Sequence, residues 1–318
     1  MTHTTIIAVG ELLVEFVSHL EGCELRKLAE YSGPYPSGAP AICIEQASRV
    51  GASTQIFGAV GDDNFGKVLT DRLATNSVGT DGISSVSGKS TGVAFVSYFS
   101  DGSRTFIFHL NNTAADTIDI QSITLPEGPL ILHVSGSSLG NPHLRVAIES
   151  VAEQVLLRGG KISCDPNARP ELMRDPIVMT SLRQLVENSS FLFPSDVDLD
   201  YLYPDKSTRE AIDTLLNDGA HTIALTMGEQ GSIIYSKDHD PLKLSGHEVD
   251  EIDPTGAGDC YCGTFLAMVV AGHPLEICGR YANAAGAMAV TKRGPMEGNS
   301  NLDDIESFIK RNPAIARG

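Results

Sequence analysis

The stretch IDPTGAGDCYCGTFLAMVVAG, residues 252–272, joins an acidic, glycine-rich turn directly to an apolar segment. Asp253 and Asp259 lie on either side of the small residues TGAG, 255–258. The apolar residues that follow predict a helix that begins inside this turn. This arrangement places the Asp259 carboxylate in the first turn of an apolar helix, and a charged group at that position needs a physical reason.

A helix start of this composition is suited to binding an anion. Its first backbone N–H groups have no partner within the helix, and they lie at the positive end of the helix dipole. Gly256 and Gly258 leave room for an anion, Thr255 is expected to cap the helix, and Asp259 follows in the first turn. Asp259 then either accepts a proton from a hydroxyl that attacks a phosphate, or is simply stabilised by the dipole. The chain contains no GxxxxGKS or GxxxxGKT sequence, which excludes a Walker-type loop.

The composition is that of a globular protein with an acidic surface. Of 318 residues, 42% are hydrophobic and 20% are charged, and 40 acidic residues against 23 basic ones give a net charge of −17. Proteins that bind nucleic acid or anionic membranes need a basic footprint, so neither is expected as a partner. An anionic ligand remains possible, because it needs only a local cluster of donors.

The cysteines and the start of the chain indicate a reduced, cytoplasmic, soluble protein. None of the six cysteines forms a CxxC pair or has zinc-ligand spacing. The first residues, MTHTTIIAVG, lack the basic region and cleavage site of a secretory signal. No apolar run approaches the roughly 20 residues that span a bilayer.

Short apolar runs alternate with longer amphipathic segments along the chain. Strands are predicted at 6–10, 54–61, 129–136, 160–166, 189–195 and 221–228, and helices at 39–50, 64–76, 142–158, 171–187, 206–218, 256–272 and 274–292. This alternation predicts one α/β domain over residues 1–318, with a mostly parallel sheet between two layers of helices. Ligands of such sheets bind beyond the carboxyl ends of the strands.

Two segments interrupt this alternation. Residues 12–18 and 91–110 alternate apolar and polar side chains, and the second has a turn at 100–103. They are interpreted as antiparallel strands of a small β lid formed by 12–32 and 91–112, too small to fold alone. The other interpretation is an antiparallel edge of the main sheet. Exposed strand edges and apolar faces also suggest that two lids pair in a homodimer.

Several motifs, in the same order along nearly the whole chain, resemble those of the ribokinase-like (PfkB) carbohydrate kinases, with closer similarity to their tagatose-kinase-like and fructokinase-like bacterial members. The motifs are SGAPAICIEQASRVG (37–51), FGAVGDDNFG (57–66), DPNARP (165–170), TMGEQG (226–231), DPTGAGD (253–259) and ANAAGAMAVTKRG (282–294). The resemblance implies a ribokinase-like three-layer fold and an ATP- and Mg²⁺-dependent sugar kinase. A monovalent cation such as K⁺ is a further possible cofactor.

The resemblance also assigns roles in the glycine-rich turn. Asp259 would be the catalytic base that deprotonates or orients a sugar hydroxyl. The N–H groups of Gly256, Ala257 and Gly258 would stabilise the γ-phosphate, and Asp253 would support the loop or a nearby cation. Residues implied on the nucleotide side are Ser195, Thr226, Gly228, Gly231, Thr255, Gly256, Gly258 and Asn283.

Two of the nucleotide-side assignments have alternatives. Ser195 and Asp198 occupy the place of the family's NxxE motif, and Asp198 would hold magnesium through water. The stretch DVDLD (196–200) also reads as a solvated acidic helix start. Helix packing is the alternative explanation for Asn283, and as a single residue it is the better one.

On the sugar side the chain departs from the family pattern. Glu15 stands where the family usually has an aspartate that binds sugar hydroxyls, although it could also be an ordinary paired carboxylate on a strand. The family's GGxxAN motif reads SGAPAI here, so Ile42 replaces an asparagine and could form an apolar wall. Gly38 and Ala39 remain expected neighbours of the sugar.

The lid sequence bears on the substrate. Keto-deoxygluconate kinases resemble one another in an arginine that faces the substrate carboxylate, and FIFHLNNTAAD (106–116) contains none after Arg104. A buried carboxylate without a cation is costly, so a neutral ketohexose such as tagatose or fructose is expected, although Arg169 could compensate. His109 and Asn111 could bind its hydroxyls, or His109 could lie in a lid interface. The alternatives are a 2-keto-3-deoxygluconate, sugar-phosphate or nucleoside kinase, or a silent sugar or nucleotide sensor.

Overall fold

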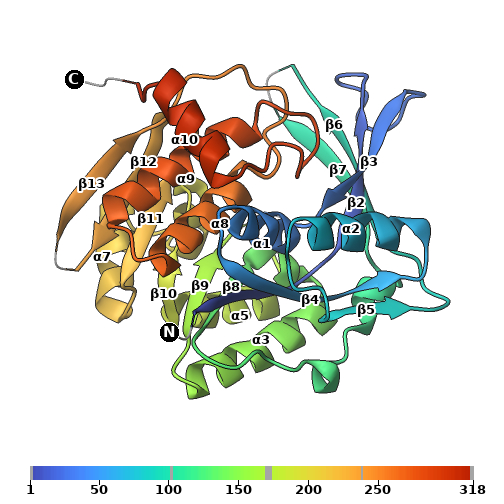
Figure 1. Ribbon diagram of the computed structural model, residues 1–318, viewed down its shortest axis with the longest axis horizontal. Coiled ribbons are helices and arrows are strands. Elements are labelled where there is room, and N and C mark those ends of the chain that lie inside the picture. The colour runs from blue at the N-terminus through green and yellow to red at the C-terminus, as the bar shows by residue number, and fades with distance from the viewer. Residues whose placement is uncertain (1–2, 101–102, 169–173, 238, 316–318) are drawn as a thin grey trace.

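A nine-stranded sheet lies between two layers of helices in the computed structural model, which describes residues 3–100, 103–168, 174–237 and 239–315 (Figure 1). The strand order is β13-β12-β11-β10-β9-β8-β1-β4-β5, and the pairs from β11 to β5 are all parallel. The strands are β1 (Thr5–Val9), β4 (Ser53–Gly61), β5 (Ile83–Val86), β8 (Leu130–Ser135), β9 (Lys161–Asp165), β10 (Ser189–Leu192), β11 (Thr222–Thr226), β12 (Gly231–Ser236) and β13 (His239–Ser245). The predicted α/β class, with a mostly parallel sheet between two layers of helices, is therefore confirmed.

The central strands are buried on both faces, and this is why their sequences are continuously apolar. In β1, Ile6 and Ala8 belong to one buried cluster, while Ile7 and Val9 belong to the cluster on the opposite face. The helices that cover the two faces are α1 (Ala39–Arg49), α2 (Asn64–Thr75), α8 (Ala257–Val270), α9 (Leu275–Ala289) and α10 (Leu302–Arg311) on one side, and α3 (Pro142–Leu157), α5 (Pro176–Glu187), α6 (Asp196–Leu202) and α7 (Thr208–Asp218) on the other.

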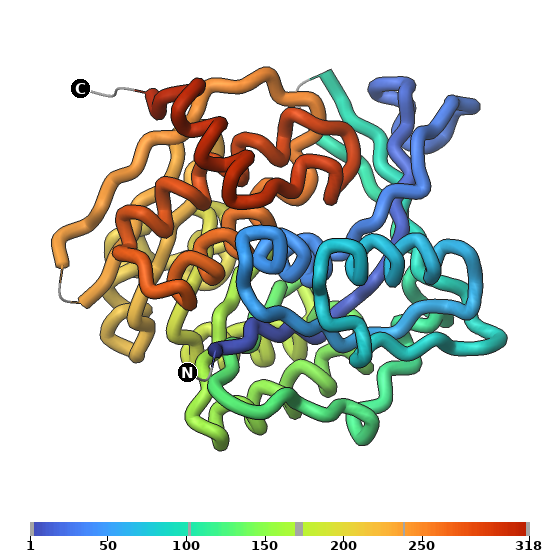
Figure 2. Tube along the Cα trace, viewed as in Figure 1, coloured from blue at the N-terminus to red at the C-terminus, as the bar shows by residue number. Residues whose placement is uncertain are grey.

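The two alternating segments do meet in a separate small sheet, although not entirely as predicted. Its order is β3 (Tyr31–Ser37), β2 (Leu13–Ser18), β6 (Gly92–Tyr98) and β7 (Arg104–His109). The outer pairs are antiparallel, but β2 and β6 run parallel, and β3 extends past the expected boundary at residue 32. Figure 2 shows these distant parts of the chain side by side. We call this four-stranded sheet the lid.

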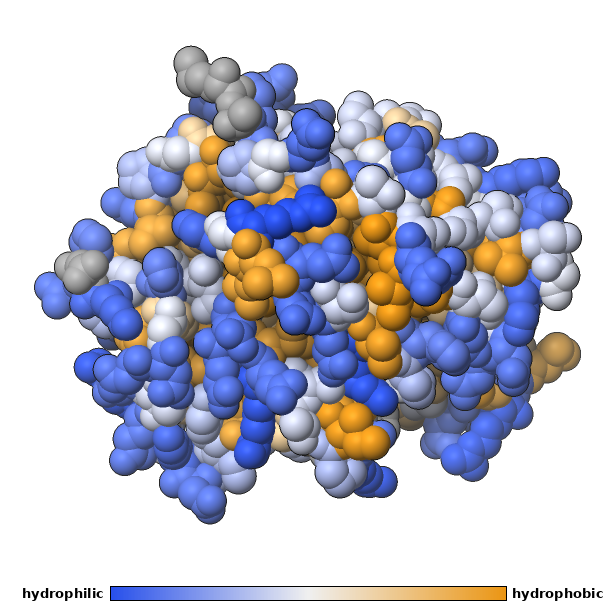
Figure 3. Space-filling view, turned by 90° about the horizontal axis from the view of Figure 1, so that it is seen from below, coloured by the Kyte–Doolittle hydropathy of each residue, from blue (hydrophilic) through white to orange (hydrophobic). Residues whose placement is uncertain are grey.

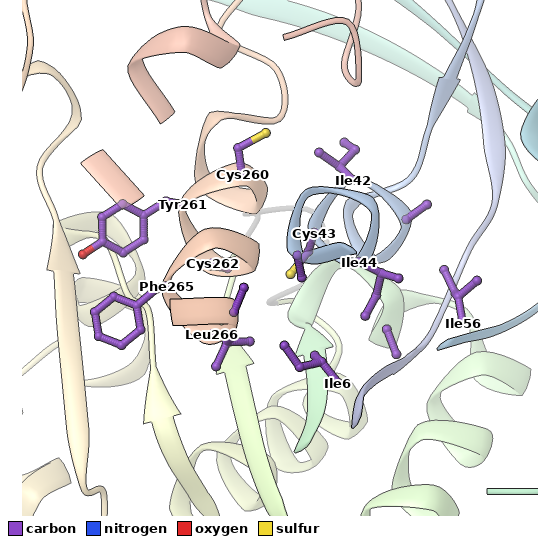
Figure 4. Packing of buried hydrophobic residues seen from close by; sticks show 14 of the residues in the cluster. Ile6, Ile42, Cys43, Ile44, Ile56, Cys260, Tyr261, Cys262, Phe265 and Leu266 are labelled. Atoms are coloured by element: carbon purple, nitrogen blue, oxygen red, sulfur yellow. The ribbon is translucent and has the colours of Figure 1, made fainter. Parts of the chain in front are cut away.

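Helices α1 and α8 approach closely in the core beneath the glycine-rich turn (Figure 4). A Cβ atom at Gly263 would lie 2.3 Å from the Cys43 carbonyl oxygen, so glycine is required for this approach. Cys43, Cys260 and Cys262 lie in the same cluster, and burial raises the pKa of each thiol well above its usual value. All six cysteines are buried, and none forms a disulfide.

His133 is fully buried on β8, where its Nδ1 atom lies 3.1 Å from the Ser163 hydroxyl. Burial lowers its pKa from 6.5 to about 4. The unfolded chain therefore binds a proton at a pH where the folded protein does not, and stability should fall by about 3 kcal/mol as the pH drops from 6.5 to 4. Urea denaturation over this range should show the loss in the wild type and a smaller loss in His133→Gln. An equal loss of unfolding free energy in the two proteins would contradict the assignment of this pH dependence to His133.

The surface is mixed in hydropathy (Figure 3). On the face seen from below in Figure 3, hydrophilic side chains surround smaller hydrophobic patches. Among the described residues, no helix is both long enough and apolar enough to cross a membrane.

Candidate active site

A cavity of about 510 Å³ opens between the lid and the carboxyl ends of the parallel strands. This is the edge at which ligands of open α/β sheets bind, and the volume suits a small-molecule site. The strand-end residues that line it are Glu11 after β1, Ser137 and Ser138 after β8, Asp165 at the end of β9, Phe193 and Ser195 after β10, and Thr226 at the end of β11.

The glycine-rich turn forms one wall of the cavity. The N-cap of α8 is Gly256 with a left-handed φ of 86°, so the expectation that Thr255 caps this helix is wrong. A Cβ atom at Gly256 would lie 2.4 Å from the Pro295 carbonyl oxygen. Only glycine therefore fits, and the conformation directs the open end of α8 towards the cavity, where Gly258 also lines the wall.

The two aspartates of the turn have different surroundings. Asp259 lies in the first turn of α8 and lines the cavity, although only 8% of the residue is exposed. Asp253 is completely buried and accepts hydrogen bonds from the backbone N–H groups of Thr255, at 3.0 Å, and Gly294, at 2.9 Å. Asp253 therefore holds the loop, whereas Asp259 faces the space in which a substrate would bind.

The start of α1 forms the opposite wall. Gly38 has a φ of 114°, and a Cβ atom there would lie 2.3 Å from the Glu11 carbonyl oxygen. Gly38, Ala39, Glu15 and Ile42 all line the cavity, as predicted for the sugar side. The N-terminal ends of α1 and α8 thus lie at one cavity, and each carries the positive end of a helix dipole.

The lid contributes side chains from one face of β7. Arg104, Phe106 and Phe108 line the cavity, as does Asn111 beyond the strand. His109 lies on the other face of β7, with its ring 6.3 Å from that of Phe95, so the structure does not bring it to the site as predicted. Arg169 lies outside the described residues.

On the nucleotide side only part of the predicted set reaches the cavity. Ser195, Asp198 and Thr226 line it. Gly228 and Gly231 follow Thr226 at the two ends of a short 3-10 turn outside the cavity lining. The side chain of Asn283 instead donates to the carbonyl oxygens of residues 244 and 245, at 3.2 and 3.3 Å, and so joins α9 to β13.

Ser195 and Asp198 form a capping box at the start of α6. The Ser195 N–H and hydroxyl donate to Asp198 Oδ2 at 2.7 and 2.6 Å, and the Ala168 N–H donates to Oδ1 at 2.6 Å. This arrangement fixes the carboxylate at the cavity wall. Asp198 is thus a buried capping residue whose two oxygens both accept hydrogen bonds, not a side chain of a solvated acidic helix start.

Sequence reasoning missed several residues of the site. Glu11 is buried, accepts a hydrogen bond of 2.5 Å from the Ser138 hydroxyl, and lines the cavity. Asp165, Asn167 and Arg104 also line it. The signal for Glu11 and Asp165 was present, because each directly ends or follows a predicted buried strand.

Acidic side chains far outnumber basic ones around the cavity. Arg104 is its single cationic side chain among the described residues. Five carboxylates line the same space, and they are Glu11, Glu15, Asp165, Asp198 and Asp259. A cavity of this kind offers many acceptors to hydroxyl groups and little to neutralise an acidic substrate.

Comparisons with known proteins agree with this geometry. Residues 3–302 match the family described as pfkB family carbohydrate kinase. The chain is 31% identical to probable fructokinase-2 of Arabidopsis thaliana, over 96% of this chain and 95% of that protein. The E. coli protein designated ribokinase II, solved with ATP and Mg²⁺, is 37% identical and superposes with a TM-score of 0.91, over 97% of this chain and 99% of that one. A Vibrio cholerae fructokinase double mutant bound to fructose, ADP and potassium shares the fold at 23% identity, with a TM-score of 0.85 over 96% and 98% of the two chains.

Proposed function

The chain belongs to the pfkB family of carbohydrate kinases, and from that premise we propose that it transfers the γ-phosphoryl group of ATP to a hydroxyl of a neutral ketohexose, such as fructose or tagatose. One observation carries the proposal. The open end of α8, with Asp259 in its first turn, faces a cavity that five carboxylates and one described cation line. The named fructokinase relatives are consistent with such a substrate.

Each wall of the cavity has a part in this reaction. The sugar binds beside Glu15, Gly38 and Ile42, where the Glu15 carboxylate accepts hydrogen bonds from its hydroxyl groups and the start of α1 offers backbone N–H groups. Asp259 accepts the proton of the attacking hydroxyl as the new P–O bond forms. The N–H groups of residues 256–258 stabilise the charge on the transferred phosphoryl group. The lid covers the site and keeps out water, which would otherwise compete as acceptor.

The donor set fits a magnesium ion bound together with the nucleotide. Mg²⁺ prefers oxygen ligands, keeps several waters, and is usually held by one or two carboxylates plus phosphates. Asp198 and Ser195 offer such oxygens at the cavity wall, and the described residues contain no cluster of three or more acidic, histidine or cysteine side chains that would form a closed cage. When bound, the ion would neutralise phosphate charge.

Arg104 supports a second candidate. Its guanidinium lines the cavity and could pair with a carboxylate, as a 2-keto-3-deoxygluconate kinase requires. However, Arg104 Nη1 lies 3.4 Å from Thr255 Oγ1, on the side of the glycine-rich turn, whereas the proposed sugar wall is formed by Glu15 and Gly38. This position favours a contact with phosphate over a contact with the sugar.

A coupled ADP-release assay with Mg-ATP tests the proposal. The substrates are tagatose, fructose, ribose, 2-keto-3-deoxygluconate, fructose 6-phosphate and adenosine. Turnover confined to the neutral ketoses is the expected result. Turnover on the sugar acid alone would select the second candidate. If all six fail while Mg-ATP binds in calorimetry, the proposed substrate class is wrong and a silent sensor is favoured.

We also propose that two copies pair through their lids. Tyr31 and Ile107 remain exposed on the face that turns away from the cavity, beside Phe95 and His109, and β3 and β7 are open edges. Sedimentation equilibrium at micromolar concentration should show a dimer, which Ile107→Lys should convert to a monomer. A monomeric wild type would remove this part of the proposal.

A further inference from the structure

A chain of hydroxyl groups connects the lid to the glycine-rich turn. Tyr98, at the end of β6, donates a hydrogen bond from its hydroxyl to Asp253 Oδ1. The Tyr98 oxygen also lies 2.8 Å from Thr255 Oγ1, and Arg104 Nη1 reaches the same Thr255 oxygen at 3.4 Å. Tyr98 and Arg104 are paired across β6 and β7, so both contacts come from the same end of the lid.

The direction of these hydrogen bonds follows from the chemistry of the groups. A carboxylate only accepts, and a phenol has a single proton, so Tyr98 gives that proton to Asp253. The Thr255 hydroxyl must then donate to Tyr98, and Arg104 donates to Thr255. Burial and the neighbouring Asp253 carboxylate raise the pKa of Tyr98, so its hydroxyl stays protonated at any physiological pH.

Asp253 is the point at which this contact reaches the phosphate-binding turn. Its carboxylate is held by the lid through Tyr98, by the turn itself through the Thr255 N–H, and by the segment after α9 through the Gly294 N–H. The carbonyl oxygen of Pro295, in that same segment, leaves no room for a side chain at Gly256. The left-handed conformation of Gly256 is thus fixed from two sides. One is the segment after α9, and the other is the lid, which acts through Tyr98 and Asp253.

Resting on the proposed kinase function, we propose that Tyr98 is a positioning residue that transmits the position of the lid to the phosphate-binding turn. With the lid in place, Tyr98 completes the set of donors on Asp253 and the N–H groups of residues 256–258 are aimed at the cavity. When the lid lifts to admit sugar, Asp253 loses this donor and the turn is less well fixed. Phosphoryl transfer to water in the open site is thereby disfavoured.

Tyr98→Phe tests this role, because it removes one oxygen and keeps the ring. Tyr281→Phe is the matched control, since Tyr281 also donates to a carboxylate, Glu306, at 3.4 Å and lies on α9. We expect Tyr98→Phe to lower kcat by about tenfold to a hundredfold, with KM for the sugar within about twofold of wild type.

Hydrogen exchange in the substrate-free protein gives a second readout that does not need turnover. Amides in residues 253–260 should exchange faster in Tyr98→Phe than in wild type, and Tyr281→Phe should leave them unchanged. Unchanged exchange in this segment overturns the proposal, as does an active wild type whose kcat Tyr98→Phe leaves intact. If the wild type phosphorylates none of the sugars, the proposed function has failed, and the exchange result alone decides whether Tyr98 couples the lid to the turn.

Discussion

Replacing Asp259 with asparagine should lower kcat for sugar phosphorylation by about 10²–10⁴-fold, because the amide cannot accept the proton of the attacking hydroxyl. The change removes a charge but almost no volume, so the start of α8 should keep its shape. Affinity for Mg-ATP and for the sugar should therefore change little. Steady-state kinetics, with nucleotide binding measured by calorimetry, would show the separation of kcat from binding.

Asp304→Asn is the matched control for this experiment. Asp304 is the third residue of α10, as Asp259 is of α8, but its side chain is exposed and lies outside the cavity lining. Both substitutions remove a favourable interaction with a helix dipole, which is worth about 0.3–1 kcal/mol at an exposed site. If Asp259→Asn kept more than about a tenth of the wild-type kcat, the base role would be wrong.

Gly256→Ala should have the second largest effect. The new Cβ atom would lie 2.4 Å from the Pro295 carbonyl oxygen and 3.3 Å from Ile42 Cγ2, in a residue whose φ is 86°. The turn has to move, and the N–H groups that it presents move with it. Loss of one well-aimed donor typically costs on the order of a hundredfold or more in kcat, and we expect at least that loss here.

Gly272→Ala separates steric conflict from backbone strain. Gly272 follows the other end of α8 with a φ of 83°, but no heavy atom lies within 4 Å of the Cβ position. Both alanines carry a left-handed penalty of about 1–2 kcal/mol, which urea denaturation can measure. Only Gly256→Ala should also lose activity. Equal activity in the two variants would show that the turn tolerates displacement.

Much of the fold could be predicted from local patterns. The run IIAVG (6–10) corresponds to β1 at Thr5–Val9, and the predicted helix 256–272 corresponds to α8 at Ala257–Val270. These elements are buried on nearly all sides, so their sequences carry a strong apolar signal. The parallel pairing of β2 with β6 was not predictable in this way, because it depends on where α1 and α2 carry the chain between them.

Site residues were predictable where a sequence motif or the end of a strand places them. They were not predictable where the orientation of a strand determines which side chains reach the cavity. Asp259 was singled out by the glycine-rich helix start, and Gly38 by the family motif that SGAPAI resembles; both line the cavity. His109 and Arg104 lie on the same strand, and its alternation shows only that they face opposite ways. Which face of β7 covers the cavity depends on how the lid packs against the main sheet. His109 was therefore predicted to contact the substrate, and Arg104 was not.

The lid also has a consequence for how the enzyme can diversify. Its strands enter between β1 and α1 and again between β5 and β8, so Glu15, Gly38 and Asn111 all belong to the first half of the chain. The turn that carries Asp259 comes from the last quarter. If the proposed roles hold, mutations in the proposed sugar wall can therefore accumulate in one stretch of the gene while the proposed phosphate-binding turn is inherited unchanged.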